Sequence, residues 1–351
     1  MQCLADELKE RGTLGDEGLR TLLESEDPLL EQRLLANARE VTDRTFGRNV
    51  WLRALIEWTN VCRNDCLYCG IRRSNAAVAR YTLSRTEILS CCAQAWQAGV
   101  HTFVLQGGEH PAGVEALVDT VAEIRAAWPD AAITLSLGEL APETYARLRR
   151  SGADRYLLRH ETADAAHYAR LHPKPQTLEN RLACLRVLRE TGFQTGTGMM
   201  VGSPYQTTDH LIADLRFIER FRPEMIGIGP FIPQRDTPFR DFPAGSARLT
   251  VRLIALLRLM HPDALIPSTT ALSVLSPDGR MSGIRAGANV VMPDFTPSAQ
   301  RAEYRLYEGK NAAWTETVAN LQTLREELAR EGYAIAAGRG DSPRTIQPVT
   351  R

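Results

Sequence analysis

Three cysteines stand within eight residues of one another, at Cys62, Cys66 and Cys69. Their C-x3-C-x2-C spacing follows an apolar run from Val50 to Ile56, which predicts a buried strand leading into a tight thiol loop. A structural zinc site takes four nitrogen or sulfur ligands in two pairs, and no second Cys/His pair follows at finger spacing. A cubane iron–sulfur cluster usually takes four thiolates, so three would leave one iron open to a small molecule. We therefore predict one 4Fe-4S cluster with an open coordination position.

The residues between and beside these cysteines are polar, and an aromatic residue, Tyr68, directly precedes the third thiol. This combination resembles the signature of the radical S-adenosylmethionine (SAM) enzymes. The resemblance implies that the open iron binds the amino and carboxylate groups of SAM. Three buried core cysteines and a zinc knuckle are the alternatives. The charges of Arg63 and Asp65 beside the thiols argue against a core position.

The bulk composition is that of an ordinary globular protein, with 44% apolar and 24% charged residues. The 42 basic and 42 acidic residues give zero net charge, which argues against a nucleic-acid surface. No stretch reaches the ~18–20 apolar residues of a membrane span, and the N-terminus lacks the features of a secretory signal. Reduced cluster thiols also favour a reducing compartment. We expect a cytoplasmic protein that binds neither nucleic acid nor membrane.

From residue 50 onward, short β-branched runs alternate with helical stretches, which is the βα pattern of a parallel sheet. The expected strands cover residues 51–58, 101–106, 132–137, 154–159, 195–201, 225–229, 265–270 and 289–292. The expected helices between them cover residues 84–98, 114–127, 142–151, 164–170, 177–191, 207–221, 247–260 and 279–287. Eight such units predict a complete (β/α)8 TIM-type barrel, with an open doubly wound sheet as the alternative. The expected division is an N-terminal helical layer (1–48), the barrel (49–310), and a C-terminal helix with a mobile tail (311–351).

In such a barrel, functional side chains lie at the carboxyl ends of the strands, where this sequence places polar residues and glycines. The run Gln106 to Glu109 resembles the superfamily's Gly-Gly-Glu element, in which glycine lets backbone approach a ligand closely. Arg159 and Glu161 are two apart and should point the same way, the guanidinium suiting the SAM carboxylate. A surface ion pair is the alternative for these two. The expected SAM contacts are Tyr68, Gln106, Gly107, Gly108, Glu109, Thr134, Ser136, Arg159, Glu161, Arg181, Met200 and Ile228.

The last two strands end in small hydroxyls and a soft thioether, which suit a compact metal fragment better than a zwitterionic amino acid. The expected substrate contacts are Ser268, Thr269, Thr270, Met292 and Tyr307. Core packing is the alternative for Met292. No further His/Cys pair or carboxylate cluster stands out at the strand ends, so we assign no catalytic side chain beyond the cluster and SAM.

Several longer blocks look like the HydE family of radical SAM FeFe-hydrogenase maturases, and together the resemblance covers about residues 15–310. The blocks are Ile56–Arg73, Arg80–Tyr81, Leu105–Glu109, Leu135–Glu139, Tyr156–Thr162, Gly227–Pro233 and Ala288–Pro293. Biotin synthase and methylornithine synthase are similar in barrel and motif. Some HydE proteins carry three further cysteines for a second cluster. Ala312, Asn320 and Thr323 stand at those positions here, so we expect a single cluster.

The HydE resemblance implies reductive cleavage of SAM to a 5′-deoxyadenosyl radical. The reaction would serve assembly of the di-iron subcluster of FeFe-hydrogenase on an iron carbonyl cyanide cysteine precursor. The implied partners are other maturases (the iron synthon donor and a GTPase scaffold) and a one-electron reductant such as ferredoxin or flavodoxin. The alternatives are a mutase or sulfur-insertion enzyme of the methylornithine or biotin synthase type, and a non-catalytic carrier of an iron fragment.

Overall fold

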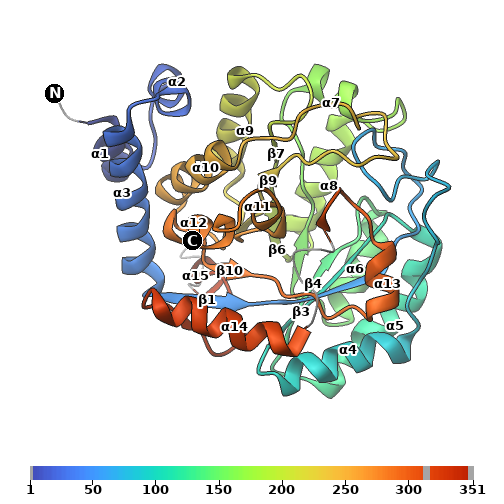
Figure 1. The fold of residues 1–351 in the computed structure, drawn as a ribbon. Helices are drawn as coiled ribbons and strands as arrows, with labels where there is room; N and C mark the ends of the chain where they lie inside the picture. Colours follow the sequence, from blue (N-terminus) through green and yellow to red (C-terminus); the bar gives the residue numbers. More distant parts are fainter. Residues whose placement is uncertain (1–2, 311–316, 347–351) are drawn as a thin grey trace.

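The computed structural model describes residues 3–310 and 317–346. Its first three helices, α1 (Leu4–Arg11), α2 (Asp16–Glu24) and α3 (Pro28–Phe46), form a layer at one side of the molecule (Figure 1). The Asp27 side chain accepts the Leu29 N–H (2.9 Å), which caps the start of α3. The layer buries leucines against α9 (Thr208–Phe221) and α10 (Ala247–Met260), so it is attached through a continuous apolar core.

The central sheet has six parallel strands in sequence order, which confirms the expected βα pattern. Its strands are β2 (Ala54–Thr59), β3 (Thr102–Gly107), β4 (Ala132–Ser136), β5 (Arg155–Leu157), β6 (Gln194–Thr197) and β8 (Met225–Ile226). The remaining strands are β10 (Val290–Val291), β1 (Asn49–Leu52) and β11 (Ala334–Ile335), paired in that order, and β7 (Met200–Val201) paired with β9 (Gly229–Pro230).

A complete (β/α)8 barrel was expected, but the described residues do not form one continuous closed ladder. Between the six-stranded sheet and β10 the connection consists of single parallel bridges, Met225 to Leu265 and Pro267 to Val290. The stretch 265–270 was expected to be a strand. In the structure it forms only these single bridges, because Pro267 has no N–H to donate to a ladder and because helix α11 begins at Thr270.

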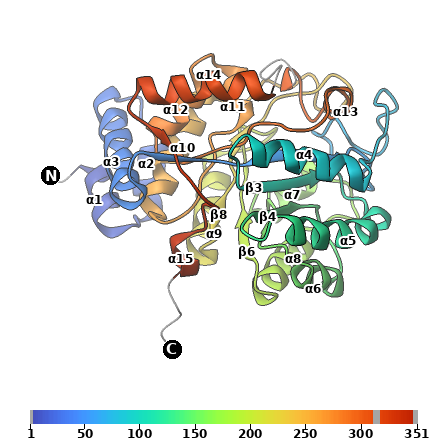
Figure 2. The same cartoon turned by 90° about the horizontal axis from the view of Figure 1, so that it is seen from below.

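The longer connecting helices lie where the periodicity predicts them, on the outer side of the strands (Figures 1 and 2). Besides those already given, the helices are α4 (Arg85–Gln97), α5 (Pro111–Ala127), α6 (Pro142–Arg150), α7 (Ala165–Leu171), α8 (Leu178–Glu190), α11 (Thr270–Leu275), α12 (Gly279–Arg285), α13 (Ser298–Glu303), α14 (Thr317–Arg330) and α15 (Pro343–Ile346). The short helices α11, α13 and α15 were not predicted. Alternate strand residues such as Ile56 and Trp58 pack under these helices. The residues between them, including Glu57, therefore face the other side of the sheet.

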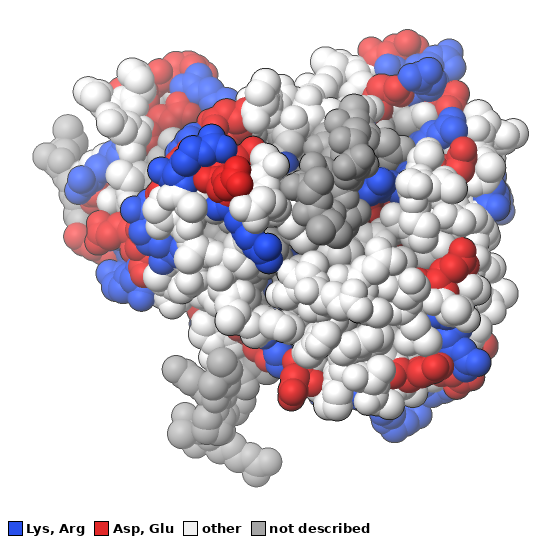
Figure 3. Space-filling view, turned by 60° about the horizontal axis from the view of Figure 1, so that its bottom comes forward, with Lys and Arg blue, Asp and Glu red and all other residues white. Residues whose placement is uncertain are grey.

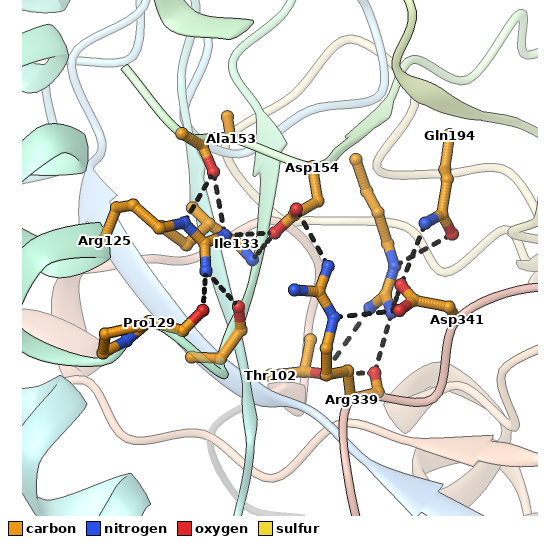
Figure 4. Close-up of polar contacts among 12 residues, drawn as sticks. Thr102, Arg125, Pro129, Ile133, Ala153, Asp154, Gln194, Arg339 and Asp341 are labelled. Atoms are coloured by element: carbon orange, nitrogen blue, oxygen red, sulfur yellow. Dashed lines mark hydrogen bonds and ion pairs between the residues drawn. The ribbon is translucent and has the colours of Figure 1, made fainter. Parts of the chain in front are cut away.

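The C-terminal segment was expected to be mobile from Gly338 onward, and residues 347–351 of it lie outside the described residues. The part that the structure describes is held in place by ion pairs (Figures 2 and 4). It crosses the amino ends of the strands, where Asp341 pairs with the fully buried Arg155 at 2.7 Å. Arg339 pairs with Asp154 at 2.9 Å, and its carbonyl accepts a hydrogen bond from Thr102 (2.9 Å). Asp341 is the carboxylate partner of the buried Arg155 among the described residues, so this ion pair keeps the tail against the sheet.

Acidic and basic residues lie beside one another on the face seen in Figure 3, around a broad area without charged side chains. This interspersed arrangement agrees with the zero net charge. None of the helices in the described ranges has both the length and the apolar character needed to cross a membrane.

Candidate cofactor site

The three predicted cluster ligands lie on the long loop that joins β2 to α4, light blue in Figure 1. Arg80, which the sequence analysis named within a resemblance block but gave no role, holds this loop in shape. Its guanidinium donates to five loop carbonyls, those of Asn60 (2.7 Å), Ile71 (2.8 Å), Arg72 (2.5 Å), Arg73 (3.5 Å) and Asn75 (3.0 Å). One cation bound to several carbonyls fixes the loop without any regular secondary structure.

Cys62, Cys66 and Cys69 are half-buried residues, whereas Cys91, Cys92 and Cys184 are buried. The core-cysteine alternative therefore fits the second group and not the first. Burial raises the pKa of the Cys69 thiol to about 12, with the neighbouring Cys62 adding to the effect. Burial likewise raises the pKa of Cys66 well above its ordinary value, followed by the effect of Cys69 and Cys62. These effects place the three thiols in one region of the loop. Among the described residues they do not converge on one point as the ligands of a single metal ion would.

Gly107 and Gly108 were expected to let the backbone approach a ligand closely. The structure shows another reason why residue 108 is a glycine. A Cβ atom at Gly108 would lie 2.3 Å from the Val61 carbonyl oxygen and 2.8 Å from Cys62 Cβ. It is therefore the cysteine loop that approaches Gly108 closely, and a side chain there would push the loop away. The next residue donates its backbone N–H to the Cys62 sulfur (3.4 Å), so the end of β3 supports the first ligand directly.

Glu109 has a buried carboxylate that already holds several donors. It accepts from Arg63 Nε (2.6 Å) and Asn64 Nδ2 (2.9 Å) of the cysteine loop, and from the Glu139 backbone N–H (3.0 Å). The carboxylate thus ties the ends of β3 and β4 to the cysteine loop. A SAM ammonium at Glu109 would share the carboxylate with these donors.

Arg159 and Glu161 form an ion pair, with Arg159 Nη2 2.8 Å from Glu161 Oε2. An ion pair was the alternative to SAM binding by these two residues, but the Glu161 side chain is only 13% exposed, so the pair does not lie on the open surface. Glu161 has a left-handed backbone (φ 66°), a strained conformation for a residue with a side chain. Beside it Arg181 Nε lies 2.7 Å from Glu139 Oε1, so two ion pairs stand near the ends of β4 and β5. Glu139 is the partner that the sequence analysis did not assign.

The other expected SAM contacts divide into two groups. Tyr68 and Met200 belong to one cluster of apolar side chains, so the cysteine loop and β7 meet there. Gln106 and Ser136 pair in register at the ends of β3 and β4, next to Gly107. The Ile228 side chain instead packs in the core shared with the N-terminal helices, which leaves only its backbone for a ligand.

Some of the expected substrate residues already have contacts within the protein. Ser268 donates its hydroxyl to the Arg280 carbonyl (2.9 Å), so α12 already occupies it. Thr270 is the first residue of α11, and Met292 packs beside Met225 and other apolar side chains. Burial raises the pKa of Tyr307, and the nearby Glu57 adds to this shift.

Unpartnered polar atoms show that the site can hold a polar ligand. Thr134 Oγ1, Arg159 Nε and Thr269 Oγ1 are buried without a hydrogen-bond partner among the described residues. Such atoms are rare in proteins unless a ligand or water completes them. Beside the cysteine loop lies a cleft of about 510 Å³, whose lining includes Glu109 and Glu139. Neither the three cysteines nor these unpartnered atoms line that cleft. The fit to an iron–sulfur cluster and SAM therefore rests on the chemistry of three thiols on one loop and of the unpartnered polar groups.

The chain is similar to known proteins in sequence and in fold. A family profile described as the Radical SAM superfamily matches residues 56–218. The chain is 43% identical over 341 residues to "[FeFe] hydrogenase maturase subunit HydE" of Thermotoga maritima, covering 97% of each chain. It is 32% identical over 305 residues to 3-methylornithine synthase of Methanosarcina barkeri, covering 85% of this chain and 84% of that one. The crystal structure of methylornithine synthase (PylB) superposes with a TM-score of 0.83 at 28% identity, covering 95% and 97%.

The parallel sheet, the thiol loop at its carboxyl edge and these matches define a radical SAM enzyme, a class that uses a 4Fe-4S cluster and SAM. Within that class the chain belongs to the HydE family.

Proposed function

We propose that this protein cleaves SAM reductively as one step in assembling the di-iron subcluster of FeFe-hydrogenase. The substrate in this proposal is an iron carbonyl cyanide complex of cysteine. The observation that carries the proposal is the group of three thiols beside the Arg159–Glu161 pair at the carboxyl edge of the sheet. The 43% identity to a HydE maturase supports the choice among radical SAM reactions.

Cys62, Cys66 and Cys69 would hold one 4Fe-4S cluster, which with SAM supplies a one-electron cleavage to methionine and a 5′-deoxyadenosyl radical. Around it, the Arg159 guanidinium has a free, buried Nε that can orient a carboxylate. Glu161, a strained residue at the same strand end, is placed to accept from an ammonium or a ribose hydroxyl. The apolar cluster around Tyr68 excludes water from the other side.

The remaining expected SAM contacts follow from their positions. Thr134 has a buried, unpartnered hydroxyl, which suits a polar part of the ligand. Thr269 offers a second hydroxyl of this kind for the substrate, with Met292 and Tyr307 as further substrate contacts. We further propose that the stretch with the single bridges at Leu265 and Pro267 takes the place of the seventh strand. The strands would then surround the reaction as in a complete (β/α)8 barrel.

The proposed partners are other hydrogenase maturases, which supply the iron synthon and a GTPase scaffold, and ferredoxin or flavodoxin as reductant. The proposed location is the cytoplasm, since cluster thiolates need a reducing compartment.

The proposal is tested with anaerobic, reduced protein and SAM, with and without an iron–cysteine synthon, followed by mass spectrometry of the nucleoside products. We expect an adduct between deoxyadenosine and sulfur that forms only with the synthon, because the radical attacks the sulfur or metal end of the complex. A carrier without turnover would leave SAM intact.

A second candidate function is hydrogen abstraction from an amino acid, as in a mutase. The similarity to 3-methylornithine synthase, 32% identity over 85% of the chain, favours it specifically. Deuterium-labelled substrate separates the two reactions. Deoxyadenosine that carries substrate deuterium in step with turnover would establish the mutase reading and exclude attack on sulfur.

A further inference from the structure

The segment 171–176 runs from the last residue of α7 toward α8. It contacts the cysteine loop through Leu171, His172 and Gln176. The Leu67 N–H donates to the Leu171 carbonyl (3.0 Å), which joins the two backbones. The Tyr68 hydroxyl lies 3.0 Å from His172 Nε2. The Cys66 sulfur lies 3.3 Å from Gln176 Oε1. No role was expected for His172 or Gln176, because neither belongs to a motif.

The hydrogen bonds of His172 fix the direction of the Tyr68 contact. His172 Nδ1 is 2.9 Å from the Tyr168 carbonyl oxygen, which can only accept, so Nδ1 carries the proton. His172 Nε2 is then the acceptor, and the Tyr68 hydroxyl donates to it. His172 is buried and stacks on the Tyr168 ring, with centroids 3.9 Å apart. The start of the segment is therefore rigidly attached.

The end of the segment is equally restricted. Pro173 and Pro175 limit the backbone, and the Gln176 N–H donates to the Pro173 carbonyl (2.9 Å) in a turn. The next residue caps α8, where Thr177 Oγ1 accepts the Asn180 N–H (3.2 Å). The Gln176 side chain is thus held beside Cys66 by structure on both sides.

As a protonated thiol, Cys66 donates to Gln176 Oε1, and Gln176 Nε2 is buried with no partner among the described residues. A thiolate that ligates a cluster has no proton to donate and can only accept. The acceptor oxygen of Gln176 would then face an acceptor sulfur. Rotation of the amide by half a turn exchanges its oxygen and nitrogen at nearly the same positions, and the idle donor then points at the sulfur.

We propose that Gln176 is a positioning residue that donates an N–H···S hydrogen bond to the Cys66 thiolate and thereby raises the reduction potential of the cluster. Hydrogen bonds to cluster sulfurs are among the factors that set such potentials, because they stabilise the extra negative charge of the reduced form. This inference rests on the proposed cluster ligation by Cys62, Cys66 and Cys69. It adds a residue outside the signature motif that adjusts how readily one electron is accepted.

The test is the midpoint potential of the reconstituted protein without SAM, from a dithionite titration in which one electron reduces each cluster and EPR follows the reduced form. For Gln176→Leu we expect about a tenfold weaker reduction equilibrium, which is about 59 mV more negative for one electron. Gln176→Glu should shift in the same direction, because it adds an acceptor and removes the donor. Gln97→Leu, the same substitution at an exposed residue of α4, should match the unchanged protein.

A second measurement uses the unchanged protein, so it does not require a variant to assemble the cluster. The unchanged protein is labelled with 15N-glutamine, and pulsed EPR of its reduced cluster should show a weak 15N coupling. Unshifted potentials in both Gln176 variants, or no 15N coupling in the labelled protein, would overturn the inference. A protein that assembles no cluster on the three cysteines would instead refute the proposed function.

Discussion

Replacing Lys310 by Met should destabilise the protein strongly, because this lysine is paired in the interior. Lys310 Nζ lies 2.6 Å from Glu57 Oε1 and 3.8 Å from Asp294 Oδ2. The Glu57 side chain is completely buried and that of Lys310 is 8% exposed. Removing one partner of a buried ion pair typically costs about 3–5 kcal/mol, since the other charge is left without compensation.

The cost of Lys310→Met should also depend on pH. Burial raises the pKa of Glu57 well above its ordinary value, Asp294 raises it further, and Lys310 opposes the shift. Removing Lys310 therefore raises this pKa more. Between the pKa values of the unfolded and folded states, the folded protein keeps a proton that the unfolded chain has lost. Stability then falls by about 1.36 kcal/mol for each unit of rising pH, so the deficit should be smallest near pH 4.5 and grow toward pH 8.

Urea unfolding under anaerobic conditions, repeated at several pH values, measures this deficit as a shift of the midpoint. The double variant Glu57→Gln/Lys310→Met should recover most of the loss, because residue 57 then carries no charge that could be left unpaired. A loss under about 1 kcal/mol at pH 8 would contradict the calculation. So would a double variant no more stable than the single one.

Three further predictions concern the ligands, the metal content and the tail. Arg159→Ala should weaken SAM binding by about 1–3 kcal/mol in titration calorimetry, the range for a lost charge-assisted hydrogen bond, and unchanged affinity would reassign Arg159 to the substrate or to structure. Reconstituted protein should hold ~4 iron atoms per chain because one cubane is expected, and a reproducible excess with a second EPR signal would contradict a single cluster. Asp341→Ala should lower the melting temperature because it leaves the buried Arg155 unpaired, whereas Asp341→Asn should recover part of the loss through its remaining hydrogen bonds.

Two of the positions behind the single-cluster prediction, Ala312 and Asn320, lie outside the residues whose side chains the structure describes. The third, Thr323, lies on α14. Iron analysis therefore tests this prediction, and the SAM chemistry does not depend on its result.

Local patterns predicted most of the fold. The helix expected over 142–151 runs from Pro142 to Arg150, because its apolar spacing, its N-terminal proline and its polar face are all local signals. Pairing between distant segments was not predictable. Strand β11 has only two residues, too few to show a period, and it pairs with β1 near the other end of the chain. The attachment of the tail depends in the same way on Arg155, which no motif marks.

The cysteine motif could be found in the sequence because cluster chemistry requires a fixed spacing, whereas the residues that support the loop follow no fixed spacing. Arg80 holds the cysteine loop through backbone carbonyls, and any residue type can supply a carbonyl. Gly108 was expected to let the backbone approach a ligand. Its close approach to Val61 could not be predicted, because it depends on how the end of β3 packs against the cysteine loop. For the same reason Glu139 was left without a role until its pairing with Arg181 was seen.

The central claim is that Cys62, Cys66 and Cys69 are the ligands of a cluster that cleaves SAM. The most direct measurement compares the unchanged protein with Cys66→Ala, each reconstituted anaerobically, reduced and incubated with SAM, by chromatography of methionine and the adenosyl product. We predict that the unchanged protein forms both products and that Cys66→Ala forms neither, because one missing thiolate prevents assembly of the site-differentiated cluster. Cleavage of SAM by the Cys66→Ala protein at the rate of the unchanged protein would contradict the account.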